Sequence, residues 1–208
     1  IGDFAMACLD AAKGRVAAIK PQVAFFEAHG PQGMQVLAEL QRAAIDAGIL
    51  VIIDAKRGDI GSTSKAYAEA WIGHDAPFPS DALTVNPYLG IDTLEPFLDR
   101  ADAQAAGLFV LVRTSNPGAG DLQDLKVDGA PVFTRLADRL APIAAARARV
   151  DLLLERIFVV AEPRHDLRDE AAVAGRVDGD GRRAGGRRAR LHGVYGEDVP
   201  GCGRQEPC

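Results

Sequence analysis

The sequence has few cysteines and no long apolar run, and both absences limit the classes of protein to which it can belong. Its three cysteines, Cys8, Cys202 and Cys208, fit neither a disulfide framework nor the spacing of a zinc site, which indicates a reducing compartment. No apolar run reaches the ~18 residues of a membrane-spanning helix, and no segment resembles a secretory signal. We therefore expect a cytoplasmic protein without a membrane partner.

The chain also lacks an excess of positive charge. Its formal net charge is −5, which argues against nucleic acid as a general partner. A phosphate-bearing ligand would have to be attracted by a local group of cations. With 208 residues, 48% of them hydrophobic, the chain can bury a substantial core and is most simply one domain.

The most informative stretch is residues 51–71, VIIDAKRGDIGSTSKAYAEAW, where an aliphatic strand pattern passes through charged residues into a helical pattern. The aliphatic residues 49–53 predict a strand buried on both faces, as in a parallel sheet. Because strand side chains alternate, we expect Asp54 and Lys56 to point the same way, with Asp59 at the carboxyl end of the strand. Charge therefore gathers at one rim of the sheet, although a solvated strand end with incidental ion pairs is also compatible with this spacing.

The helix after this rim is expected to bury one stripe. Ser62 or Thr63 can cap its amino terminus. The apolar positions that recur at helical spacing are Ala66, Tyr67, Ala70 and Trp71.

The pattern of an aliphatic strand with a polar carboxyl end occurs in other parts of the chain. Lys20 ends a strand at residues 16–20, and further strands are expected at 82–88 and 107–113. These units predict a parallel sheet whose functional groups lie at its C-terminal edge. Helices are expected at 3–13, 35–47, 91–103 and 131–149, and one more strand at 156–161.

Four motifs carry a resemblance to a known family. IKPQVAFFE, DAKRGDIGST, TVNPYLG and RTSNPGAGD occur in that order, and together they resemble the bacterial branch of the orotidine 5′-phosphate decarboxylases that is written with DAKRGDIG. The resemblance covers about residues 4–145. It implies an α/β fold of the (β/α)8 TIM barrel type and a homodimer with shared active sites. It also implies decarboxylation of orotidine 5′-monophosphate to uridine 5′-monophosphate in pyrimidine biosynthesis, without a metal or other cofactor.

The charged residues of the first two motifs suit this chemistry. Decarboxylation leaves negative charge at C6 of the pyrimidine, so the site needs a cation that can also deliver a proton, and we assign that role to Lys56. Asp54 and Asp59 flank Lys56 and favour its ammonium form. Lys20 would hold Asp54 in place and hydrogen-bond the ribose. Because the four charges nearly cancel, burying them together costs less.

The resemblance also implies substrate-binding residues outside the charged network. Asp59 would reach the active site of the partner subunit, with Ile60 and Thr63 beside it. Ser115 would contact the pyrimidine ring, although the residues around it are also compatible with an ordinary turn. Gln205, at the end of VPGCGRQ, would correspond to a glutamine of the phosphate-binding loop.

Two parts of the chain depart from the resemblance. A complete barrel of this type has about 250 residues, and we expect its first strand, which carries an aspartate that contacts the ribose, to be missing here. The last 34 residues carry nine Gly and seven Arg. We therefore divide the chain into a barrel portion at 1–174 and an aberrant or disordered Gly/Arg-rich tail at 175–208. A frame-shifted or truncated coding sequence would produce such a tail, and an RNA-binding arm is the alternative.

Two further functions remain open. A magnesium-dependent sugar-phosphate lyase of the same superfamily shares the Asp-x-Lys-x-x-Asp pattern, and metal dependence would distinguish it. The chain could also be a non-catalytic remnant, and because the phosphate loop is degraded we expect weak or no turnover from it.

Overall fold

The computed structural model describes residues 1–147 and 150–154 of the chain. Within them lies a parallel five-stranded sheet, in the order β1-β2-β3-β4-β7. The strands are β1 (Ala18–Ile19), β2 (Leu50–Arg57), β3 (Ala82–Val85), β4 (Gly107–Arg113) and β7 (Val150–Leu154). Because the spatial order follows the chain order and every neighbouring pair is parallel, the sheet is wound in one direction, as in the wall of a (β/α)8 barrel. The described residues form an incomplete barrel of this α/β class.

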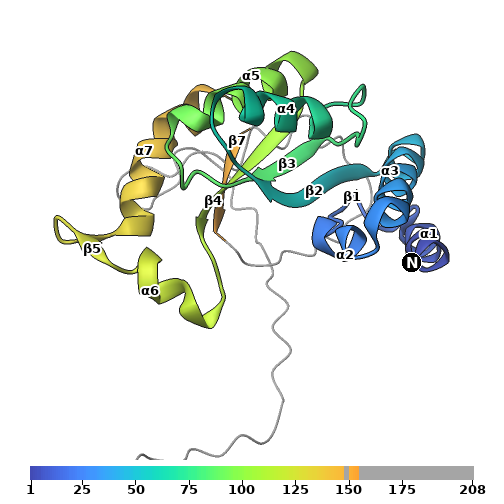
Figure 1. Cartoon of the computed structure of the whole chain (residues 1–208), viewed down its shortest axis with the longest axis horizontal. Coiled ribbons are helices and arrows are strands. Elements are labelled where there is room, and N and C mark those ends of the chain that lie inside the picture. The colour runs from blue at the N-terminus through green and yellow to red at the C-terminus, as the bar shows by residue number, and fades with distance from the viewer. Residues whose placement is uncertain (148–149, 155–208) are drawn as a thin grey trace, which may run out of the picture. The chain divides into compact units, whose positions relative to one another are not determined.

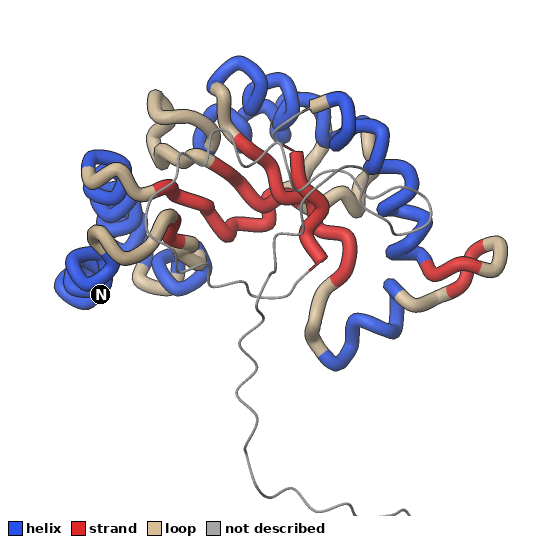
Figure 2. Tube along the Cα trace, turned by 180° about the vertical axis from the view of Figure 1, so that it is seen from behind, coloured by secondary structure: helices blue, strands red, loops and turns tan. Residues whose placement is uncertain are grey.

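Helices connect the strands and cover the outer face of the sheet (Figure 1). The helix α4 (Gly61–Trp71) packs against α5 (Glu95–Gln104), and Figure 2 shows the strands gathered beneath them. A 3-10 turn at Asp92–Leu94 precedes α5. The other helices are α1 (Gly2–Ala12), α2 (Val23–Glu27), α3 (Gly30–Asp46), a short α6 (Gly120–Gln123) and α7 (Val132–Ala146). Between α6 and α7 lies a small antiparallel hairpin of β5 (Lys126–Val127) and β6 (Ala130–Pro131).

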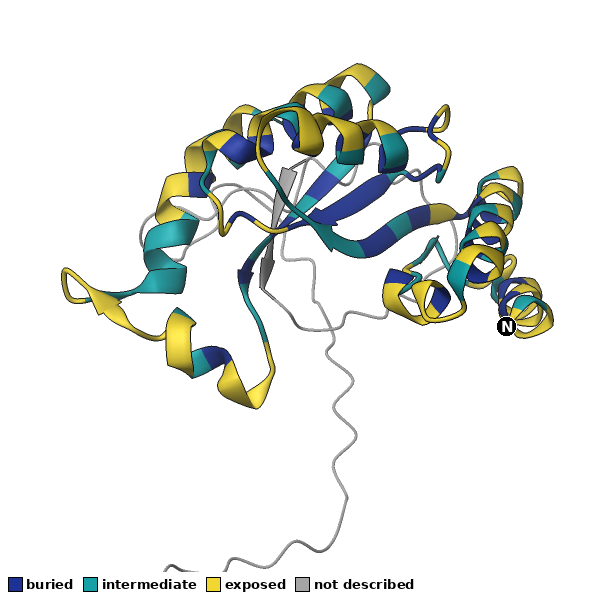
Figure 3. Cartoon of the chain, in the orientation of Figure 1, coloured by how far each residue is buried: buried dark blue, intermediate teal, exposed yellow. Residues whose placement is uncertain are grey.

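The core lies between the sheet and these helices. All four residues of β3 are buried, which suits a central parallel strand, whereas β4 alternates between buried and half-buried positions. Figure 3 shows the buried residues along the strands and on the inner sides of the helices. Phe97 of α5 and Leu37 of α3 are fully buried. Burial of such apolar side chains supplies the main stabilising free energy of the fold.

The predicted cap of α4 is wrong, and its predicted buried stripe is confirmed in part. The residue before the helix is Ile60, which makes no side-chain cap, and Ser62 and Thr63 lie inside the first turn. Ser64 instead donates its hydroxyl hydrogen bond to the carbonyl of Asp59. The buried positions of this helix are Ser64, Ala68 and Trp71, whereas Ala66 is exposed. The predicted stripe is confirmed at Trp71 and, as half-buried positions against the core, at Tyr67 and Ala70, whereas it fails at Ala66.

Other predicted elements differ at their ends. The first strand is shorter than 16–20, and the short helix α2 that comes after it was not predicted. The helix expected at 131–149 ends at Ala146, and β7 begins at Val150. The strand expected at 156–161 and the domain boundary at 174/175 lie outside the described residues. No helix of the described part is both long and apolar enough to cross a bilayer.

Candidate active site

The centre of the candidate site is the carboxylate of Asp54, near the end of β2. Lys56 Nζ lies 2.5 Å from Asp54 Oδ1, and Lys20 Nζ lies 3.1 Å from Asp54 Oδ2. Each oxygen therefore has its own cation. The residue Asp54 is 8% exposed, whereas the two lysine side chains keep 34% and 41% exposure. The buried carboxylate is therefore bound by two lysine side chains that are partly exposed to solvent.

Lys20 reaches this carboxylate because the chain continues alongside β2 after β1 ends. The backbone N–H of Asp54 donates to the carbonyl of Pro21 at 3.0 Å, and Gln22 forms a parallel bridge with Asp54. The carboxyl ends of two adjacent parallel strands meet at the same edge of the sheet, so Lys20, which follows β1, reaches the carboxylate that Lys56 of β2 also contacts.

The pKa of Asp54 is lowered from its ordinary value. Burial by itself raises this pKa, but the hydrogen bonds and positive charges of Lys56 and Lys20 together outweigh the burial. Asp54 is consequently ionised at neutral pH. It is an anion held between two cations.

The backbone of β2 is irregular at this point. Lys56 has φ +48°, in the left-handed region that L-residues rarely adopt, and the pairing of β2 with β3 shifts between Ile53 and Arg57. Such conformations persist where the surrounding structure enforces them, and they are concentrated at functional sites. Thr84 of β3, which sequence reasoning missed, lies opposite the irregularity and accepts a hydrogen bond from the Lys56 N–H at 2.9 Å. The signal that could have found it is a hydroxyl in the otherwise aliphatic strand ALTV.

Arg57 anchors the end of the same strand to two helices. Its guanidinium pairs with Glu27 of α2 and lies over the rings of Tyr67 and Trp71 of α4, 5.6 and 5.3 Å from their centroids. These contacts join the end of β2 to the middle and the C-terminal end of α4.

Asp59 lies between β2 and α4, where its Oδ1 accepts a hydrogen bond from the N–H of Ile60 at 2.8 Å. The loop is close-packed, because a Cβ added at Gly58 would lie 2.5 Å from the carbonyl oxygen of Asn86. Ile60 is 60% exposed, and Thr63 is exposed in the first turn of α4. Ile60 and Thr63 are thus exposed at the amino terminus of α4 and Asp59 is half-buried, whereas Lys20 and Lys56 both contact Asp54.

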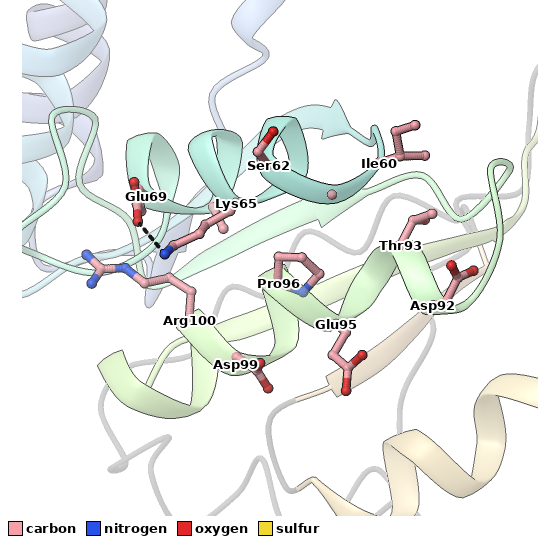
Figure 4. Close-up of a pocket in the computed structure, with 12 residues that line it drawn as sticks. Ile60, Ser62, Lys65, Glu69, Asp92, Thr93, Glu95, Pro96, Asp99 and Arg100 are labelled. Carbon is pink, nitrogen blue, oxygen red and sulfur yellow. Dashed lines mark ion pairs between the residues drawn. The ribbon is translucent and has the colours of Figure 1, made fainter.

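Ile60 also begins a groove between α4 and α5, shown in Figure 4. Lys65 and Glu69 of α4 form an ion pair on one wall, at 3.9 Å. The remaining charged residues that line the groove come from α5 and the turn before it: Asp92, Glu95, Asp99 and Arg100.

Ser115 lies in the loop after β4 and is exposed. The side chain of Gln123 holds the start of this loop by two contacts with Thr114, accepting from its N–H at 2.8 Å and donating to its hydroxyl at 2.7 Å. The Thr114 hydroxyl in turn donates to Asn116 Oδ1 at 2.6 Å. Gln205 lies outside the described residues. Within those residues, no three His, Cys, Asp or Glu side chains lie close enough together to hold a metal ion.

The strands of the five-stranded sheet run parallel in chain order, helices form the connections between them, and ionisable groups lie at the carboxyl ends of β1 and β2. This arrangement is the framework of an α/β-barrel enzyme. The model of the orotidine 5′-phosphate decarboxylase / HUMPS family matches residues 3–150. The chain belongs to this family.

Individual relatives agree with this assignment. An orotidine 5′-phosphate decarboxylase of Rhodopirellula baltica is 50% identical over 152 residues, which cover 71% of this chain and 50% of that protein. One from Salinispora tropica is 40% identical over 200 residues, covering 95% and 71%. Among solved structures, Leishmania donovani OMP decarboxylase is 38% identical with a TM-score of 0.59, over 71% of this chain and 59% of that one. A Streptomyces avermitilis structure is 41% identical with a TM-score of 0.70, over 81% and 58%. The chain spans about half the length of several curated relatives that it matches.

Proposed function

We propose that this chain supplies the proton-delivering part of an active site that decarboxylates orotidine 5′-monophosphate to uridine 5′-monophosphate. The observation that carries the proposal is the buried, ionised Asp54 with one lysine on each oxygen, in a chain of the orotidine 5′-phosphate decarboxylase / HUMPS family.

In the proposed reaction, the bond between C6 and the carboxyl carbon breaks and carbon dioxide leaves. The electron pair left on C6 takes a proton from Lys56 Nζ, and the resulting amine regains a proton from water. Asp54 holds Nζ in place through a contact of 2.5 Å. Because the Asp54 carboxylate holds Lys56 Nζ in position before the reaction begins, the ammonium group needs little movement as charge develops on C6.

The other predicted residues take roles around this step. Lys20, whose side chain is 41% exposed while it holds Asp54, has a free side toward the proposed ribose. Ser115 is proposed to contact the pyrimidine ring, and Gln205 the phosphate end. The two contacts of Gln123 with Thr114 support the role of Ser115, because they keep the start of its loop in one position.

We further infer a homodimer in which Asp59, Ile60 and Thr63 contribute to the partner's site. The exposure of Ile60, 60% for a large apolar side chain, supports this role, as does the charged groove that begins beside it. The proposed reaction uses no metal or other cofactor, and the cysteine pattern still favours the cytoplasm as its location.

Binding and turnover of the purified full chain test the proposal. Titration calorimetry with 6-hydroxyuridine 5′-monophosphate, which resembles the carbanion, should show binding that Lys56→Ala abolishes. Lys13→Ala is the matched control, because Lys13 forms a similar Asp–Lys pair on the surface of α1, at 2.7 Å. Conversion of orotidine 5′-monophosphate is measured beside binding, with and without EDTA. A folded chain that binds no analogue would contradict the proposal, and loss of activity in EDTA would favour the magnesium-dependent lyase.

Mixing two inactive variants tests the shared site. Lys56→Ala and Asp59→Ala protein, combined at dimer-forming concentration, should regain part of the activity if each site uses Asp59 from one chain and Lys56 from the other. Two independent sites would leave the mixture as inactive as its components.

A further inference from the structure

The strands β2 and β3 lose their common register where the lysine and aspartate of the site lie. Ile53 pairs with Leu83 and Arg57 pairs with Val85, so four residue steps on β2 pass only two on β3. The additional residues of β2 form a bulge, and a bulge interrupts the regular hydrogen bonds of the ladder. The N–H of Lys56, which lies in the bulge, therefore needs an acceptor from outside the regular pattern.

Thr84 supplies that acceptor. It lies between Leu83 and Val85, it is fully buried, and its Oγ1 accepts the N–H of Lys56 at 2.9 Å. The same oxygen is 3.2 Å from Asp54 Oδ1 and 3.3 Å from the carbonyl oxygen of Ile53. A hydroxyl has one proton, so Thr84 accepts from Lys56 while it donates to one of these two oxygens.

The direction of the Lys56 side chain depends on this contact. Its φ of +48° sets the orientation of the Cα–Cβ bond, and a left-handed backbone at a residue other than glycine reverts to ordinary conformations unless contacts hold it. The Thr84 hydroxyl contacts both the backbone N–H of Lys56 and Asp54 Oδ1, the carboxylate oxygen to which Lys56 Nζ donates.

We propose that Thr84 is a positioning residue for the proton-delivering lysine: one hydroxyl holds both the bulged backbone of Lys56 and the carboxylate that binds its ammonium group. This role rests on the proposed decarboxylase function. Thr84 acts through Lys56 and Asp54, because it is buried beneath them in β3.

Two substitutions separate positioning from simple packing. Thr84→Val keeps the shape of the side chain and removes the hydroxyl, whereas Thr84→Ser keeps the hydroxyl and removes the methyl group. Ser80→Ala is the matched control, since the buried Ser80 hydroxyl donates to the carbonyl of Trp71 near the opposite end of β3. All three variants lose some stability, which is followed by urea unfolding.

The first readout is the titration of the Asp54 carboxyl group, followed by ¹³C NMR of the full chain labelled at aspartate and assigned with Asp54→Asn. The expected result is a midpoint moved to higher pH in Thr84→Val, because the carboxylate loses a donor and a fixed ammonium group, with the wild-type midpoint kept in Thr84→Ser and Ser80→Ala. The same midpoint in Thr84→Val as in the wild type overturns the proposal, as does a shift in Thr84→Ser as large as that in Thr84→Val.

The second readout is turnover of orotidine 5′-monophosphate. Thr84→Val should lower kcat by about 10- to 100-fold, because a displaced proton donor is costly, while KM changes little and Thr84→Ser recovers most of the rate. Unchanged kcat in Thr84→Val overturns the proposal. If the folded wild-type chain shows no turnover and also binds no 6-hydroxyuridine 5′-monophosphate, the proposed function fails, and the carboxyl titration still decides whether Thr84 positions the lysine and aspartate.

Discussion

The substitution Asp54→Asn tests whether the ionised carboxylate stabilises the fold as well as the site. Asparagine has nearly the same shape and cannot ionise, so it resembles the protonated form of Asp54. The wild type should therefore be more stable than Asp54→Asn wherever Asp54 is ionised. The lowered pKa of Asp54 fixes the sign, because a carboxyl group with a depressed pKa in the folded state adds stability above its unfolded pKa, about 3.9. That added stability is lost as the pH falls through the folded pKa.

The magnitude follows from the two contacts and their exposure. A hydrogen bond to a charged group contributes about 1.5–3 kcal/mol. The two lysine side chains are 41% and 34% exposed, however, so water screens each pair. Burial of the carboxylate offsets a further part. We expect Asp54→Asn to lower the free energy of unfolding by about 1–3 kcal/mol at pH 7. With an m-value of about 2 kcal/mol per molar urea, the midpoint falls by about 0.5–1.5 M.

Trp71 reports this unfolding. It is the single tryptophan of the chain, it is 4% exposed, and its ring stacks on Phe78 with 4.6 Å between centroids. The control is Asp10→Asn, which removes an Asp–Lys pair of 2.7 Å whose Asp side chain is 68% exposed, and it should cost less than about 0.5 kcal/mol. Urea curves at several values between pH 3 and pH 7 give the difference between wild type and Asp54→Asn. A difference that stays constant with pH, or grows in acid, refutes the assignment of the lowered pKa to Asp54.

Two further substitutions test the packing around the site. Gly58→Ala places a Cβ 2.5 Å from the Asn86 carbonyl, so the loop before Asp59 must move, and urea unfolding should show a loss of about 1–3 kcal/mol; wild-type stability would mean that the loop adapts freely. Phe97→Ala removes a fully buried ring and should cost about 3–5 kcal/mol, whereas Phe25→Ala, at a position 71% exposed, should change stability by less than about 0.5 kcal/mol; equal effects would contradict the burial assigned to α5.

The sequence predicted the parallel sheet well because its strands are short aliphatic runs that end in polar residues. The strands β2, β3 and β4 lie within or close to the expected ranges, and the order of the sheet follows the chain. The meeting of Lys20 with Asp54 was also predictable, since adjacent parallel strands end at the same edge. Periodicity alone could locate these elements because burial on both faces leaves a simple signal.

The bulge at Lys56 was not predictable from alternation. A regular strand would place Asp54 and Lys56 on the same side, whereas their contact of 2.5 Å forms with Lys56 itself in the left-handed conformation. No glycine marks that position, and Thr84, whose hydroxyl accepts the N–H of Lys56, is 28 residues away in the sequence. The helix α2 was missed for a related reason, because five residues are too few to show helical periodicity.

The buried carboxylate couples the site to the edge of the sheet. The strand β1 has two residues, and its backbone pairing with β2 is correspondingly short. The pair between Lys20 and Asp54 continues this pairing beyond the end of β1, and the N–H of Asp54 adds a bond to Pro21. If β1 separated from β2, Asp54 would lose one cation and one backbone acceptor at once, and its remaining lysine would have to offset the burial alone. The ion pair that prepares the proposed chemistry therefore also fastens a strand too short to hold by its own hydrogen bonds.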